Sequence, residues 1–100
     1  MKRARFVDPA RRELFAEVAY YEAKEPGLAG LFLAAVEEAT ARALAYPLTG
    51  SQASERTRRM FLKDFPFALV YRPDDMGIMV FALAHLARLP DYWRKRIDGG

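Results

Sequence analysis

The sequence contains no cysteine, a single histidine and a single tryptophan among its 100 residues. Without cysteine the chain can form no disulfide, no thiolate nucleophile and no zinc ribbon. The sequence also has no glycine-rich phosphate loop, no pair of catalytic carboxylates at a defined spacing and no cluster of metal ligands. We therefore expect the protein to use neither a metal nor another cofactor.

Long apolar runs are absent as well. No segment approaches the roughly 20 apolar residues that a membrane-spanning helix requires. Lys2, Arg3 and Arg5 precede an apolar patch that is too short for the core of a signal peptide. We expect a cytoplasmic protein without a membrane partner. A hydrophobic content of 52% in 100 residues suffices for one core, which predicts a single domain over residues 1–100.

Positive charge is concentrated in the second half of the chain. Residues 1–50 carry seven Lys or Arg against seven Asp or Glu, whereas residues 51–100 carry nine against six. The formal net charge of +3 therefore arises entirely from the second half. This asymmetry indicates an anionic partner, either nucleic acid or an acidic protein segment.

Two amphipathic helices are predicted in the first half. Asp8 is expected to cap the first helix and Pro9 to occupy its first turn. Apolar residues recur every three or four positions up to Pro26, so we predict this helix over residues 9–24. The second helix, predicted over residues 28–46, carries one apolar stripe. That stripe consists of Leu28, Phe32, Ala35, Val36, Ala39, Ala43 and Tyr46.

The second half changes to a period of two, which is typical of strands. Strand-like runs, together with a weak one near the N-terminus, cover residues 3–7, 57–65, 66–72 and 78–85. Residues 47–55 have no period and are predicted to form a loop, and Pro90 and Asp91 are expected to open a short C-terminal turn or helix. The chain is thus predicted to be an α+β protein with the order β-α-α-β-β-β and a short final helix.

Three segments resemble the RelE/ParE superfamily of bacterial type II toxin–antitoxin toxins. They are YYEAKEPGLAGLFLAAVE at residues 20–37, FPFALVYR at 65–72 and HLARLPDYW at 85–93. The resemblance covers nearly the whole chain. It implies a curved antiparallel sheet packed on a two-helix hairpin, and an acidic antitoxin that wraps and neutralises the toxin. A homodimer and a heterotetramer with the antitoxin are the alternatives for its assembly.

The branches of this superfamily differ in target. RelE-like members are ribosome-dependent mRNA endonucleases, and they carry an arginine where this chain has Ala68. Some of them also use a histidine and a tyrosine at the end of the last strand. Here His85 is followed by Leu86, and the nearest tyrosine is Tyr92. ParE-like members poison DNA gyrase by binding it. We therefore favour a gyrase inhibitor, with a RelE-like ribonuclease and a degenerate toxin that only binds its antitoxin as the alternatives.

Candidate site residues follow from these alternatives. In a ribonuclease, His85 would transfer a proton while Arg58 and Arg88 would stabilise charge on the phosphate. Residues that would bind either target are Arg59, Lys63, Arg72, Tyr92, Trp93, Arg94, Lys95 and Arg96. Each feature also has a structural explanation. His85 could bond to backbone at the sheet rim, the cations could protect a sheet edge from aggregation, and the aromatic pair could fold back over the sheet.

Overall fold

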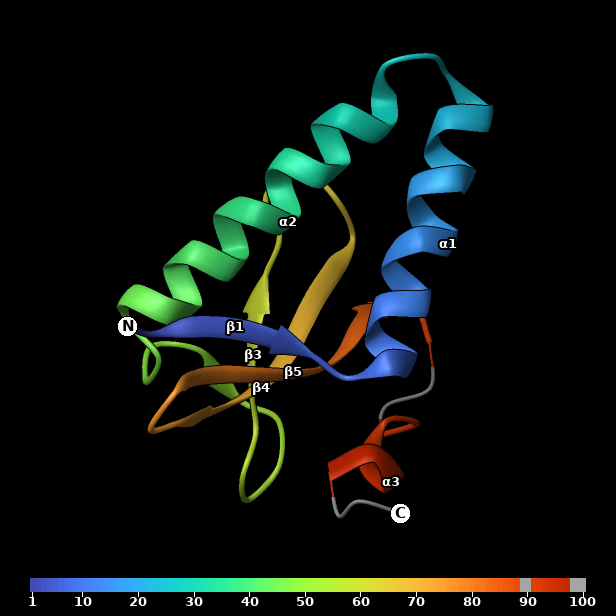
Figure 1. The fold of residues 1–100 in the computed structure, drawn as a ribbon. Helices are drawn as coiled ribbons and strands as arrows, with labels where there is room; N and C mark the ends of the chain where they lie inside the picture. The colour runs from blue at the N-terminus through green and yellow to red at the C-terminus, as the bar shows by residue number, and fades with distance from the viewer. Residues whose placement is uncertain (89–90, 98–100) are drawn as a thin grey trace.

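The structure is a computed structural model that describes residues 1–88 and 91–97 (Figure 1). Its elements, in chain order, are β1 (Arg3–Phe6), α1 (Asp8–Lys24), α2 (Leu28–Ala45), β2 (Ser51–Gln52), β3 (Arg58–Phe61), β4 (Phe67–Asp74), β5 (Gly77–His85) and α3 (Arg94–Ile97). The α+β class and the predicted order of the main elements are confirmed. The short strand β2 is an addition, because the sequence predicted only a loop there.

The five strands form one mixed sheet in the order β1-β5-β4-β3-β2. The pairs β3–β4 and β4–β5 are antiparallel, as predicted, and β2 adds a further antiparallel pair with β3. In contrast, β1 runs parallel to β5 and pairs Arg3 with Gly77. A parallel neighbour needs a long connection, which the helical hairpin and the meander provide. Gly77 has a φ of 129°, and a Cβ there would collide with the backbone of Arg3. A glycine thus permits the close approach of β1.

Helices α1 and α2 cover one face of the sheet, and the main core lies between them and the strands (Figure 1). Phe32 of α2 is fully buried, and its ring contacts those of Tyr21, Phe65 and Phe67. Most of the predicted apolar stripe faces this core. Tyr46 is an exception, with 63% of its surface exposed, because α2 ends at Ala45 and the chain turns away.

Two predicted boundaries are wrong. Asp8 is the first residue of α1 rather than its cap; the cap position is Val7, and the Asp8 carboxylate instead pairs with Arg11 at 2.8 Å. The strand predicted over residues 57–65 is shorter, because β3 ends at Phe61 and the chain turns through Asp64, whose φ is 68°. A left-handed residue interrupts an extended strand, so the pairing of β3 with β4 stops before it.

A second, smaller core lies on the opposite face of the sheet. There Trp93 is 1% exposed and packs with Val70 of β4 and Ala82 of β5. Figure 1 shows α3 on the other side of the sheet from α1 and α2. The C-terminal segment therefore forms a third layer. No helix in the described part of the chain is long and apolar enough to cross a membrane.

We expect Phe32→Ala to lower the free energy of unfolding by about 3 to 5 kcal/mol, the usual cost of truncating a core aromatic side chain. Urea denaturation followed by circular dichroism measures this change. Leu31→Ala is the matched control on the same helix, because Leu31 is 64% exposed, and it should cost much less. Equal losses in the two variants would contradict the assignment of Phe32 to the core.

Candidate functional site

The sheet face opposite to α1 and α2, called here the far face, carries most of the residues that the sequence singled out. Met60 and Leu62 belong to the core beneath α2. Because side chains alternate along a strand, Arg59 and Phe61 point to the far face instead. This agrees with the predicted alternation, in which Arg59 and Arg58 do not share a face.

A hollow of about 210 Å³, called here the sheet hollow, lies on the far face beside the C-terminal segment. It is lined by Arg59, Phe61, Ala68, Ala84, His85, Leu86, Arg88, Tyr92 and Trp93. Five of these were candidate site residues, contributed by β3, β5 and the segment after β5. The structure thus brings together residues that are separated by up to 34 positions in sequence (93 − 59).

His85 lies at the rim of the sheet, at the end of β5. Its Nδ1 accepts a hydrogen bond of 3.0 Å from the backbone N–H of Ala87, and its ring meets the edge of Phe67 at a centroid distance of 4.9 Å. A neutral imidazole that accepts through Nδ1 carries its proton on Nε2. The free nitrogen of His85 is therefore a hydrogen-bond donor in the neutral ring, whereas a general base needs a free lone pair.

Arg58 does not join His85. Its Nη1 donates to the carbonyl oxygens of Leu48 at 3.2 Å and Gly50 at 2.9 Å, which tie it to the loop after α2. In the sheet, Arg58 pairs with position 71 of β4, whereas His85 pairs with position 67. Four residues of strand separate these positions, which is about 13 Å. The three proposed catalytic residues therefore do not form one cluster.

Arg88 lies close to the sheet hollow but is engaged. Its guanidinium carbon lies 3.8 Å from the centroid of the Tyr92 ring, a cation–π contact, and its Nη1 lies 3.8 Å from a carboxylate oxygen of Glu13. The Arg88 side chain nevertheless stays 56% exposed. It can therefore contact a ligand as well, although its charge is partly balanced by Glu13.

Glu13 of α1 is the residue that the sequence analysis missed. Its carboxylate accepts hydrogen bonds from the Leu83 backbone N–H at 3.1 Å, the Tyr92 hydroxyl at 2.7 Å and Arg96 at 2.9 and 3.2 Å. Only 15% of the Glu13 side chain is exposed. The one sequence signal for Glu13 is its position in the helix. It follows the buried Ala10 by three residues and therefore lies on the same face of α1, at the margin of the core.

The contacts of Glu13 arise because part of the edge of β5 has no partner strand. The last pair between β1 and β5 joins Phe6 to Val80, so the outer edge of β5 has no partner strand beyond that point. Unpaired backbone groups are costly when water is excluded. Glu13 accepts the N–H of Leu83, and Arg96 donates to the carbonyl oxygen of Phe81 at 3.0 Å. The ion pair of Glu13 and Arg96 thus completes the edge of β5 and attaches the C-terminal segment to it.

The remaining candidate residues divide into buried and exposed groups. Burial and the hydrogen bond to Glu13 raise the pKa of Tyr92, and Trp93 is buried against the far face. Both aromatic side chains therefore fold back over the sheet. Arg94 and Lys95 are exposed. Lys63 lies 3.9 Å from Glu38, and the guanidinium of Arg72 lies 5.1 Å from the ring centroid of Phe81. Pro90 lies outside the described residues.

The described residues contain no group of three or more His, Cys, Asp or Glu side chains placed to hold a metal ion. The ring of His85, at the rim of the sheet, packs on Phe67 of the main core, whereas the far face offers a set of arginines and a shallow aromatic hollow. These groups can bind an anionic or aromatic surface.

We expect Glu13→Gln to loosen the C-terminal segment, because the amide cannot form the ion pair with Arg96. Trp93 is the only tryptophan, so its fluorescence reports this segment directly. The emission should shift to longer wavelength, and the free energy of unfolding should fall by about 1 to 3 kcal/mol. Glu17→Gln, one turn later on α1, is the control and should leave the emission unchanged. An unshifted spectrum for Glu13→Gln would contradict the attachment.

The raised pKa of Tyr92 predicts that the stability of the folded protein depends on pH at alkaline pH. Its pKa in the folded protein is raised above the ordinary value of 10.0, so the folded state holds this proton more tightly than the unfolded state. The resulting stabilisation is complete below about pH 10 and is lost as the pH rises further. Urea denaturation between about pH 8 and pH 11 should show that the free energy of unfolding falls more steeply with pH for the natural chain than for Tyr92→Phe. Parallel losses would refute the prediction.

Comparison with known proteins was made by sequence and by structure. No family model and no curated protein matches the chain. Among solved structures, the fold is similar to that of a chain described as part of the chromosomal ParDE TA system from P. aeruginosa, with a TM-score of 0.69 and 19% identity. The match covers 86% of this chain and 97% of that chain. It confirms the RelE/ParE-like fold that the sequence resemblance implied.

Proposed function

We propose that this chain is the toxin of a type II toxin–antitoxin system and that it acts as a ParE-like inhibitor of DNA gyrase. The structural neighbour belongs to a ParDE toxin–antitoxin system, and the match covers almost all of that neighbouring chain. The sequence resemblance points to the same superfamily. A toxin of this kind acts by binding its target, so the far face and the C-terminal segment are the parts that would engage gyrase.

The geometry of His85 is the observation that carries the choice of a binder over an enzyme. Cleavage of RNA through its 2′-hydroxyl needs a general base and a general acid at the scissile phosphate. His85 uses its Nδ1 lone pair for the N–H of Ala87, and Arg58 is held by loop carbonyl groups about 13 Å further along the sheet. Tyr92, a candidate acid, donates the hydrogen bond of its hydroxyl to Glu13. These arrangements support inhibition through surface contact.

A cognate antitoxin is the second partner in this proposal. A groove of about 500 Å³ runs between α2 and the turn after β3, and Leu28, Leu31, Ala34, Ala35 and Phe65 give it an apolar lining. Leu31 is 64% exposed, and Phe15 on α1 is 62% exposed. Exposed apolar surface of this kind is typical of an interaction site. An amphipathic helix of the antitoxin, placed along α2, would cover the groove.

A RelE-like ribonuclease is the second candidate function, and the sheet hollow favours it. Arg59, His85, Arg88 and Tyr92 all line this hollow. Two arginines could bind the phosphate, and aromatic rings could stack on a base. For catalysis, however, the His85 imidazole would have to give up its bond to Ala87 so that Nδ1 becomes available as a base.

The decisive experiment measures two activities of the purified chain and of three variants. The activities are inhibition of gyrase supercoiling of relaxed plasmid and cleavage of mRNA on translating ribosomes. We expect the natural chain to inhibit gyrase, and His85→Gln to inhibit it within about twofold, since removing one side chain outside a binding centre changes little. Arg94→Ala/Lys95→Ala should lose inhibition, because exposed arginines are frequent anchors of interfaces. Arg11→Ala/Arg12→Ala removes the same charge from α1 and should retain it.

Other outcomes point elsewhere. If mRNA is cleaved and His85→Gln lowers cleavage by about 10²- to 10⁴-fold, the usual contribution of a positioned acid or base, the chain is a RelE-like ribonuclease. If neither activity appears while the antitoxin still binds, the chain is a degenerate toxin. Either result would overturn the gyrase proposal.

A further inference from the structure

The largest concentration of arginines lies away from the sheet hollow, where the loop between β2 and β3 faces α3. Two adjoining hollows of about 470 Å³ and 350 Å³ share Ser54, Glu55 and Arg56 in their lining. We call them together the arginine groove. The arginines that line it are Arg56, Arg58, Arg72 and Arg94. They come from a loop, two strands and a helix, so only the folded chain assembles them.

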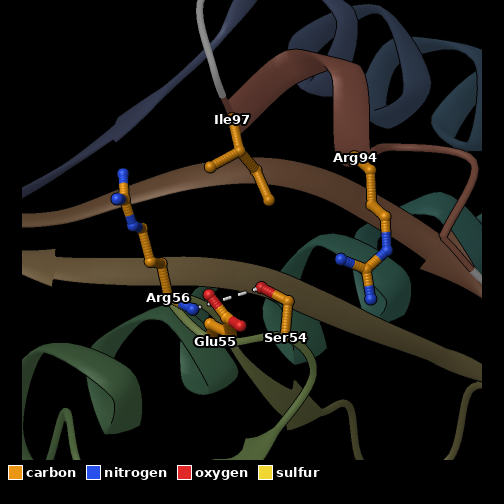
Figure 2. Close-up of a pocket in the computed structure, with 5 residues that line it drawn as sticks. All are labelled: Ser54, Glu55, Arg56, Arg94 and Ile97. Carbon is orange, nitrogen blue, oxygen red and sulfur yellow. Dashed lines mark hydrogen bonds between the residues drawn. The ribbon is translucent and has the colours of Figure 1, made fainter.

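Figure 2 shows the larger hollow at close range. Arg94 reaches down from α3 on one side, the side chain of Arg56 stands on the other, and Ile97 closes the top. Ser54 and Glu55 lie beneath. The Ser54 hydroxyl lies 2.6 Å from that of Thr57 and accepts the backbone N–H of Arg56 at 3.3 Å, so the loop is held in a defined turn. Two guanidinium groups from separate elements therefore flank one opening.

The charges of the groove are poorly balanced. Among the described residues that line it, Glu55 is the single acidic one. Arg94 has a carboxylate partner, Asp91 at 3.3 Å, whereas Arg58 is bonded to loop carbonyl groups. Within the described residues, the Arg56 side chain has neither a hydrogen bond nor an ion pair. Even with Asp91 counted against Arg94, the described lining has an excess of positive charge, which favours an anion that extends along the groove.

The residues that line the groove also indicate which class of anion it would bind. Guanidinium groups bind phosphate through paired hydrogen bonds. An acidic peptide helix would need a continuous apolar surface for its own apolar side chains. The apolar residues described in the groove lining are Leu48, Pro73 and Ile97, and they lie at separate points. Among the described residues that line the groove none is aromatic, so bases find no ring there on which to stack. These features suit the phosphate groups of a nucleic acid backbone better than either a peptide or the bases.

We propose that the arginine groove binds the phosphodiester backbone of DNA without regard to sequence. The phosphate chemistry follows from the groove alone, while the choice of DNA over RNA rests on the proposed function, because gyrase works on DNA. Bound in this way, the toxin would contact the DNA that gyrase holds as well as gyrase itself. Arg56 and Arg94 would be the principal contacts, since both are exposed and lie at the opening.

The experiment is fluorescence anisotropy of the full chain with labelled 20-mers of one sequence, as duplex DNA, single-stranded DNA and single-stranded RNA, in the absence of gyrase. We expect DNA binding with dissociation constants of about 10⁻⁴ to 10⁻⁶ M, the range for non-specific contacts. The logarithm of the binding constant should fall linearly with the logarithm of salt concentration. In Arg56→Gln/Arg94→Gln this slope should become shallower by about two, one for each lost phosphate contact.

Arg11→Gln/Arg12→Gln is the matched control, because it removes two exposed charges from α1 and should leave the salt slope unchanged. Trp93 fluorescence checks that each variant keeps its C-terminal segment in place. A second DNA of scrambled sequence should bind equally. Equal slopes for both double variants would overturn the groove assignment, and so would a polyglutamate peptide that displaces DNA at matched charge concentration. Binding of RNA alone would overturn the choice of DNA.

This result is independent of the gyrase assay. A chain that binds DNA through the groove but leaves gyrase active refutes the proposed function while the groove assignment stands. A chain that inhibits gyrase but binds no DNA refutes the groove assignment alone.

Discussion

The carboxylate of Glu13 is the interaction on which the far face depends. Strand β5 extends beyond its partner β1, and its backbone groups past Val80 would otherwise remain unpaired at an edge. Glu13 and Arg96 satisfy the N–H of Leu83 and the carbonyl oxygen of Phe81, respectively. The same carboxylate also accepts the hydroxyl of Tyr92. One residue of α1 therefore joins the helical layer, the edge of the sheet and the C-terminal segment.

Attachment of this segment decides which residues can meet a partner. Trp93 is placed on Val70 and Ala82, where it excludes water from the middle of the far face. Arg94 and Lys95 remain exposed, and Arg94 points from α3 into the arginine groove (Figure 2). The segment also contributes to the lining of two regions, the sheet hollow beside Arg59 and the arginine groove beside Arg56. A partner bound in the proposed way would therefore meet arginines rather than the buried aromatic pair.

The two regions favour different chemistry for physical reasons. At the sheet hollow the potential catalytic groups are already engaged, His85 with the Ala87 N–H and Tyr92 with Glu13. Groups held in this way stabilise the fold and would need rearrangement to transfer protons. At the arginine groove the guanidinium groups have few carboxylate partners, so their charge is available to a ligand. These differences are the basis for proposing a binding function over a nuclease.

Local sequence was sufficient for the two long helices, for strands β4 and β5 and for the separation of Arg59 from Arg58, because periodicity reports which side of an element is buried. It also limited the fold to the RelE/ParE-like class. Tertiary structure alone decided that β1 lies parallel to β5, that Trp93 is buried and that Arg58 lies far from His85. Each of these depends on contacts between distant residues. The position of Glu13 shows the reason most clearly, since its partners lie 70 or more residues away and no local pattern records an unpaired strand edge.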